Sequence, residues 1–97
     1  MAKGYWIVDL EVTDPEAYKA YQAFVRPFLA ENGGRFLVRG GQQTVAEGDV
    51  LPRSVVVEFE SYEKALAAYR SPAYQQGLQL RLNASRANFV VVEGFDA

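Results

Sequence analysis

Apolar residues gather in three short runs that are typical of β-strands. They are residues 6–8, 55–57 and 89–92. Side chains of a strand alternate between its two faces, so an unbroken apolar run indicates that both faces are shielded from water. A chain of 97 residues has helices enough for one face of a small sheet. The pattern therefore predicts that a second copy of the chain covers the other face.

The first third of the chain predicts a strand followed by a helix. We expect the strand over residues 4–12, with apolar side chains on both of its faces. Thr13 or Asp14 is expected to cap the helix, since either side chain can accept hydrogen bonds from free amides. An apolar stripe at helical spacing continues to a stop at residues 32–34. Pro27 lies inside this stretch and should kink or divide the helix, because proline lacks an amide donor.

The middle of the chain predicts a hairpin. Residues 35–39 and 53–59 are expected to pair as its two strands. Glycines at 40–41 favour a bulge, after which pairing should resume through residues 44–45. A turn is expected at residues 47–49.

The last third predicts a helix in two parts and a final strand. Ser61 is expected to cap the first part, and Ser71 with Pro72 should restart the helix in a new direction. The strand is expected over residues 88–93. The order strand, helix, strand, strand, helix, strand predicts an α+β ferredoxin-like plait over residues 1–97, with four mainly antiparallel strands and helices on one face. We expect one domain that pairs as a dimeric α/β barrel.

Composition excludes several classes of chemistry. The chain has no cysteine and no histidine, so disulfides, thiolate nucleophiles, cysteine-bound zinc and imidazole bases are ruled out. The net charge of −2 gives no electrostatic footprint for nucleic acid or an anionic membrane. No stretch approaches the ~18 apolar residues of a membrane span, and the first residues lack a signal core. We expect a cytoplasmic protein without cofactor, metal, nucleic-acid or membrane partner.

Short segments spread over nearly the whole chain recur in the order of one bacterial family. They are GYW at 4–6, DPEAY at 14–18 with Tyr21, GGRFLVRGG at 33–41, EG at 47–48, PR at 52–53, EF at 58–59, SPAYQ at 71–75 and VVEG at 91–94. Together they resemble domain of unknown function 1330, in the dimeric α/β-barrel superfamily. The resemblance implies a homodimer whose two sheets face each other around a small cavity. It implies no reaction, because proteins with this barrel include cofactor-free oxygenases, isomerases, haem-degrading enzymes and ligand sensors.

Asp9, Arg39 and Glu58 are charged residues within otherwise apolar strands. Alternation could place Asp9 and Glu58 on the face turned toward the second copy. In one interpretation they form structural ion pairs or lie at an exposed edge. In the other they are catalytic: Arg39 would hold a carboxylate or enolate oxygen, and Glu58 or Asp9 would move a proton.

Tyr74 and Arg81 lie about two helical turns apart, near the expected mouth of the cavity. They are candidate ligand-binding residues. The alternative is that Tyr74 is a core ring with its hydroxyl at the surface and that Arg81 is solvated.

These residues lead to one main hypothesis and two alternatives. The main hypothesis is a homodimer that binds a small anionic or carbonyl-bearing organic molecule in a cavity lined by Arg39, Glu58, Asp9 and Tyr74. An enzyme with these groups would be suited to cofactor-free proton transfer or isomerisation. The alternatives are a binding or sensing module without turnover and a purely structural dimer.

Overall fold

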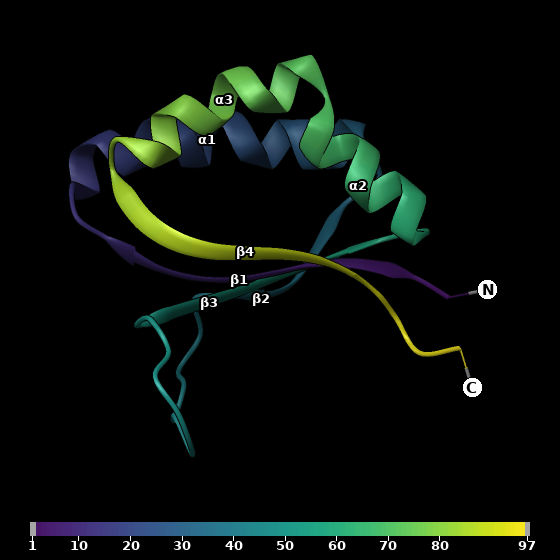
Figure 1. Ribbon diagram of the computed structural model, residues 1–97. Helices are drawn as coiled ribbons and strands as arrows, with labels where there is room; N and C mark the ends of the chain where they lie inside the picture. Colours follow the sequence, from purple (N-terminus) through teal and green to yellow (C-terminus); the bar gives the residue numbers. More distant parts are fainter. Residues whose placement is uncertain (1, 97) are drawn as a thin grey trace.

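The computed structural model describes residues 2–96, and its helices all lie on one side of a four-stranded sheet (Figure 1). The elements in chain order are β1 (Gly4–Val12), α1 (Pro15–Glu31), β2 (Arg35–Arg39), β3 (Arg53–Phe59), α2 (Tyr62–Arg70), α3 (Pro72–Leu82) and β4 (Ser85–Glu93). The strands are antiparallel in the order β2-β3-β1-β4. This arrangement confirms the predicted ferredoxin-like plait. None of the helices in the described residues is long and apolar enough to cross a membrane.

Helix α1 begins at an Asp14 cap and continues without a break through Pro27. The Asp14 carboxylate accepts a hydrogen bond from the Ala17 amide at 3.2 Å, so Asp14, and not Thr13, is the capping residue. Of the two outcomes predicted at Pro27, a kink or a division, the division does not occur. Val25 and Phe28 are both buried in the same core while Pro27 is exposed. Packing on either side of the proline therefore holds the helix together despite the missing amide.

Strand β2 has the predicted bounds, but its pairing is less regular than predicted. Its pairing with β3 shifts register between Phe36 and Val38, so the bulge lies inside the strand and not at the glycines. The Gly40 amide still donates to the Ser54 carbonyl at 2.8 Å, but no strand forms over residues 40–52, and the predicted resumption of pairing is wrong. This loop extends from the sheet on the side away from the helices (Figure 1).

The second helical region and the last strand follow the prediction closely. The Ser61 and Ser71 hydroxyls accept hydrogen bonds from the amides of Lys64 and Tyr74, both at 3.2 Å, which confirms the two caps and the restart. Strand β4 begins at Ser85, earlier than expected, because pairing with β1 extends it over a polar stretch.

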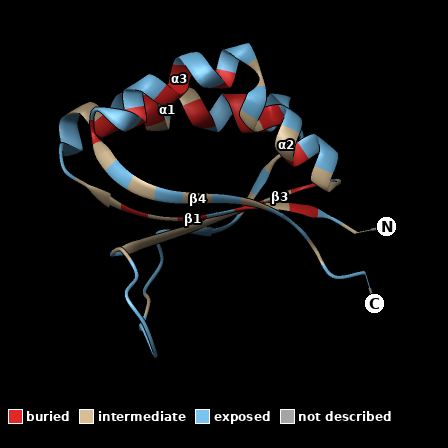
Figure 2. Cartoon of the chain, viewed as in Figure 1, coloured by how far each residue is buried: buried red, intermediate tan, exposed pale blue. Residues whose placement is uncertain are grey.

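The two faces of the sheet differ in what covers them. The face under the helices carries the core, centred on Trp6, whose indole donates to the Ala65 carbonyl at 2.9 Å. The opposite face, called the open face below, leaves Ile7 41%, Val90 53% and Val92 41% exposed. Figure 2 shows the burial as red on the inner sides of the helices and along β1, and β4 alternates between half-buried and exposed residues. The predicted apolar character of both faces is confirmed.

Candidate functional site

The structure separates the five sequence-predicted site residues by the sheet. Asp9 and Glu58 lie on the open face, paired across β1 and β3 with residues of that face. Arg39, Tyr74 and Arg81 lie on the side of the helices. The cavity expected to hold Asp9, Glu58, Arg39 and Tyr74 together is therefore not formed within one chain.

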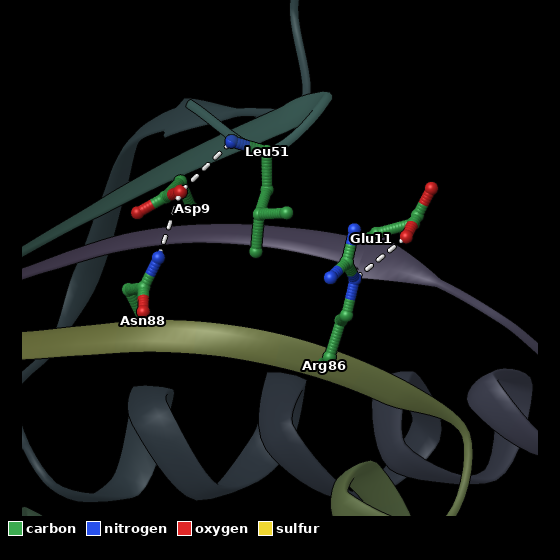
Figure 3. Close-up of polar contacts among 5 residues, drawn as sticks. All are labelled: Asp9, Glu11, Leu51, Arg86 and Asn88. Carbon is green, nitrogen blue, oxygen red and sulfur yellow. Dashed lines mark hydrogen bonds and ion pairs between the residues drawn. The ribbon is translucent and has the colours of Figure 1, made fainter. Parts of the chain in front are cut away.

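Asp9 fastens the long loop to the open face. Its Oδ2 accepts a hydrogen bond from the Leu51 amide at 2.9 Å and another from the Asn88 side-chain amide at 3.2 Å (Figure 3). Glu11 lies two residues after Asp9 on β1 and forms an ion pair with Arg86, whose Nε is 2.8 Å from Glu11 Oε1. The Asp9 carboxylate thus joins the end of the loop, β1 and β4.

Glu58 is held in a similar way on the same face. Its Oε1 accepts from Arg35 Nε at 2.9 Å and its Oε2 accepts from the Tyr5 hydroxyl at 3.1 Å. The hydrogen bond from Arg35 lowers the pKa of Glu58. Partial desolvation raises this pKa, and the hydrogen bond from Tyr5 lowers it further. A carboxylate stabilised in its ionised form is a weak proton acceptor near neutral pH.

The bulge in β2 turns Arg39 toward the helices. Val38 pairs with Val56 of the open face, and Arg39 then pairs with Val55, which faces the core. The Arg39 guanidinium stacks over the Phe36 ring, with 5.0 Å between the guanidinium carbon and the ring centroid. Strict alternation from Phe36 would have placed Arg39 on the open face.

A small cavity of about 40 Å³ lies between the sheet and helices α1 and α3, and Arg39 is part of its wall. At about 10 to 15 Å³ for each water, this space holds about three water molecules. The strands and Tyr18 and Tyr21 of α1 supply mostly apolar and aromatic walls. Four of the chain's seven arginines also line it: Arg26, Arg39, Arg53 and Arg81. No aspartate or glutamate is among its lining residues, and we call it the arginine cavity.

Arg81 is the most deeply buried charge of the arginine cavity. Only 5% of it is exposed, and its Nε has no hydrogen-bond partner. Its guanidinium lies 5.8 Å from the Tyr21 ring centroid and 5.4 Å from that of Phe89. The alternative that Arg81 is solvated is therefore wrong. Aromatic faces compensate part of the cost of burying the cation, but they leave its Nε without a hydrogen-bond acceptor.

None of the four cavity arginines forms an ion pair with a carboxylate of residues 2–96. The Nε of Arg53 is buried and unpartnered, as is that of Arg81. By contrast, Arg35 and Arg86 on the open face are each paired with a glutamate. The positive charge without a counterion is thus concentrated in the cavity.

A pair of buried phenols lies beside Arg81. The hydroxyls of Tyr21 and Tyr74 are 2.8 Å apart, and Tyr74 is fully buried, so its hydroxyl does not reach the surface. Burial raises the pKa of both phenols, while the positive charge of Arg81 opposes the rise. Both rings are therefore neutral near neutral pH, and Tyr21 borders the cavity as a hydrogen-bonding group.

Sequence reasoning missed Arg53, Arg26, Tyr18 and Tyr21 as cavity residues. Arg53 had a usable signal, since it alternates with Val55 and so shares the face of the core. The two tyrosines belong to an apolar helical stripe that packing alone explains. The described residues contain no group of three or more acidic, histidine or cysteine side chains placed to hold a metal ion.

Comparison with known proteins agrees with this fold. A family model matches residues 3–95. The chain belongs to the DUF1330 family, a domain of unknown function. No functionally curated protein matches this DUF1330 chain.

Solved structures resemble the DUF1330 chain over almost its full length. A protein of unknown function from Rhodopseudomonas palustris has a TM-score of 0.75 at 15% identity, with 99% of this chain and 85% of that chain covered. SnoaB, a cofactor-independent oxygenase from Streptomyces nogalater, has a TM-score of 0.65 at 12% identity, with 100% and 97% covered. At these identities the likeness shows the fold.

Proposed function

We propose that the DUF1330 chain binds a small organic anion in the arginine cavity. The carrying observation is Arg81, a nine-tenths buried cation whose Nε lacks a partner in a cavity without lining carboxylates. A buried charge without a partner is costly, and a bound carboxylate would supply the partner in a planar, charge-assisted contact.

The walls favour an organic acid over a simple inorganic ion. Val8, Val55 and Phe89 contribute apolar surface that would pack against carbon atoms of a ligand. The ligand is small, because the cavity holds only about three waters as it stands. Arg26 and Arg39 are exposed, so rotation of their side chains can widen the entrance without movement of the backbone.

We propose that Arg39 and Arg81 bind the anion, as the sequence suggested, and that Asp9 and Glu58 have structural roles. The stacking of Arg39 on Phe36 supports a preorganised guanidinium at the cavity wall. Asp9 and Glu58 already bind loop and strand partners on the other side of the sheet. We propose that they hold the sheet and its long loop together.

Binding without turnover is the form of the proposal that the cavity favours, because it contains no side-chain base. Cofactor-independent chemistry on the bound acid is the second candidate. The observation in its favour is the Tyr21 hydroxyl, which borders the cavity beside a guanidinium and can donate a proton or a hydrogen bond to a bound enolate.

The test is thermal unfolding with a panel of small carboxylic acids in a chloride buffer. A ligand at ~100 times its dissociation constant should stabilise the wild type by ~2.7 kcal/mol. Arg81→Met should remove this stabilisation. Arg35→Met, which removes an equal charge from the open face, is the matched control and should keep it. Failure of every acid to stabilise the wild type, or full retention of binding by Arg81→Met, would contradict the proposal.

We also propose that the open face pairs with a second copy of the chain. Its exposed apolar side chains, Ile7, Val90 and Val92 among them, would be buried by such pairing. The charges on this face support it too. Glu58 and Glu11 already have arginine partners within the chain, and Asp9 accepts two hydrogen bonds. Covering the face would therefore leave few charges without partners.

A further inference from the structure

We infer that the ligand of the arginine cavity is a dianion, a short dicarboxylate whose two carboxylates are held by Arg53 and Arg81. The inference rests on the proposed function, because it names the ligand class of the same cavity. Its starting observation is that two guanidinium Nε groups, not one, are buried there without partners.

Arg53 is held in place from the strand side. A Cβ atom at Gly40 would lie only 2.6 Å from the Arg53 guanidinium carbon, so the guanidinium packs directly against the Gly40 backbone. Gly40 has φ +69°, a conformation that side chains disfavour, and its amide bonds to the Ser54 carbonyl. The Arg53 guanidinium is therefore packed against the Gly40 backbone, with its Nε buried.

Arg81 approaches from the other flank of β1. Its guanidinium lies over Phe89 of β4, whereas Arg53 begins β3, and β1 separates these two strands. Strands two positions apart are about 10 Å from each other, and the long side chains shorten this span. Val8 and Leu10 of β1, the strand between β3 and β4, line the cavity as its apolar floor.

Tyr18 shows that both charges act on the same space. Burial raises the pKa of Tyr18, and the positive charges of Arg53 and Arg81 both oppose the rise. Both guanidiniums therefore lie within electrostatic reach of one hydroxyl on the cavity wall. Within residues 2–96 this hydroxyl has no hydrogen-bond partner, so it remains available to a ligand between the two cations.

Counting charges selects the ligand class. A monocarboxylate can bond to one of the two buried Nε groups and leaves the other without an acceptor. Two carboxylates joined by a short apolar linker satisfy both, and the linker lies on the apolar floor. The distance between the two guanidiniums sets the length of this linker.

The test compares each linear dicarboxylate from malonate to adipate with its own monomethyl ester, by isothermal titration calorimetry in a chloride buffer. The pair has nearly equal length and differs by one charge. We expect one dicarboxylate to bind at least tenfold more tightly than its ester. Equal affinities would contradict the inference that the ligand is a dianion and would leave the proposed function in place. If neither the dicarboxylates nor their esters bind, the inference and the proposed function are both contradicted.

A variant tests whether Arg53 holds the second carboxylate. Arg53→Gln should lose the preference for the dicarboxylate and keep the affinity for the ester. Arg35→Gln, the matched control on the open face, should keep the preference. If Arg53→Gln does not fold, Gly40→Ala provides the same test, because the added methyl group displaces the Arg53 guanidinium. Preference retained in a folded Arg53→Gln or Gly40→Ala protein would contradict the assignment.

Discussion

Under the proposed function, Arg81 is a residue that opposes stability and serves binding. Its burial beside Tyr21 and Phe89 gives it cation–π contacts, but no carboxylate. Buried ionic groups are often replaced by apolar side chains of similar size at no cost, because desolvation exceeds what their contacts return. A residue of this kind is expected where a ligand completes the site.

The first prediction concerns the ligand-free protein. Arg81→Met should leave the free energy of unfolding unchanged or raise it by about 1 to 4 kcal/mol, since methionine fills the space without a charge. Urea unfolding followed by circular dichroism measures the change. A loss of several kcal/mol would instead identify Arg81 as a structural residue.

The second prediction concerns the phenol pair at high pH. Because burial raises the pKa of Tyr21 in the folded state, the ordinary value near 10 applies only to the unfolded chain. The contribution of Tyr21 to stability is therefore complete below pH ~10 and is lost as pH rises further toward the folded-state pKa. Tyr21→Phe should make stability fall less steeply between pH 9 and 11.5.

Urea unfolding across this pH range provides the measurement, with Tyr62→Phe as the control at a half-buried tyrosine. Near neutral pH, Tyr21→Phe should cost about 1 to 3 kcal/mol, because the Tyr74 hydroxyl loses its partner. Equal alkaline slopes for wild type and Tyr21→Phe would show that the pair does not resist ionisation.

At the scale of elements, the sequence predicted the helices and strands better than the direction of their side chains. Strands 4–12 and 53–59 and the caps at Ser61 and Ser71 follow from alternation and capping chemistry, and the structure confirms them. Local patterns set these features, so one sequence is sufficient.

The candidate site was less predictable, and β2 shows why. The extra residue, Leu37, is an ordinary strand former, whereas the glycines that favoured a bulge come three positions later. Pairing with β3 decides where the register shifts, and that contact is distant in sequence. Arg81 was missed as a buried residue because arginine is usually exposed.

The third prediction tests the bulge. Deleting Leu37 should preserve both the fold and anion binding, because Val38 and Arg39 would keep their partners Val56 and Val55 in a regular ladder. If β2 were regular in the native chain, the same deletion would turn Arg39 to the open face and weaken binding. Calorimetry with the best carboxylate distinguishes the two outcomes.

The fourth prediction concerns the contact between α1 and α3. A Cβ atom at Gly77 would overlap the Phe24 ring, so only glycine allows this approach. Gly77→Ala should lower the free energy of unfolding by about 1 to 3 kcal/mol, although alanine is the better helix former. Phe24→Leu in the same chain should recover part of the loss, and additive effects of the two changes would contradict the contact.

At the scale of the whole molecule, the arginine cavity and the open face lie on opposite sides of one sheet. The cavity lies between the sheet and helices α1 and α3, on the side of the sheet away from the open face. We therefore expect the proposed binding and the proposed self-association to be separable, although both depend on the same strands. The cavity expected from the resemblance, enclosed between two facing sheets, would lie on the open face, and it stays a prediction.

The fifth prediction uses this separation. Sedimentation velocity at micromolar concentration should show a dimer for the wild type and a monomer for Val90→Lys, on the open face in the edge strand β4. Leu82→Lys is the matched control, because Leu82 is equally exposed, at 54%, but lies on α3. The Val90→Lys monomer should still bind the carboxylate. A monomeric wild type would contradict pairing through the open face.

The unpaired guanidiniums of the arginine cavity have a practical consequence for handling the protein. Citrate, phosphate and sulfate from purification or crystallisation solutions can occupy such a cavity and compete with any added compound. Apparent affinities will depend on which salt is present, so dialysis against Tris chloride should precede every screen.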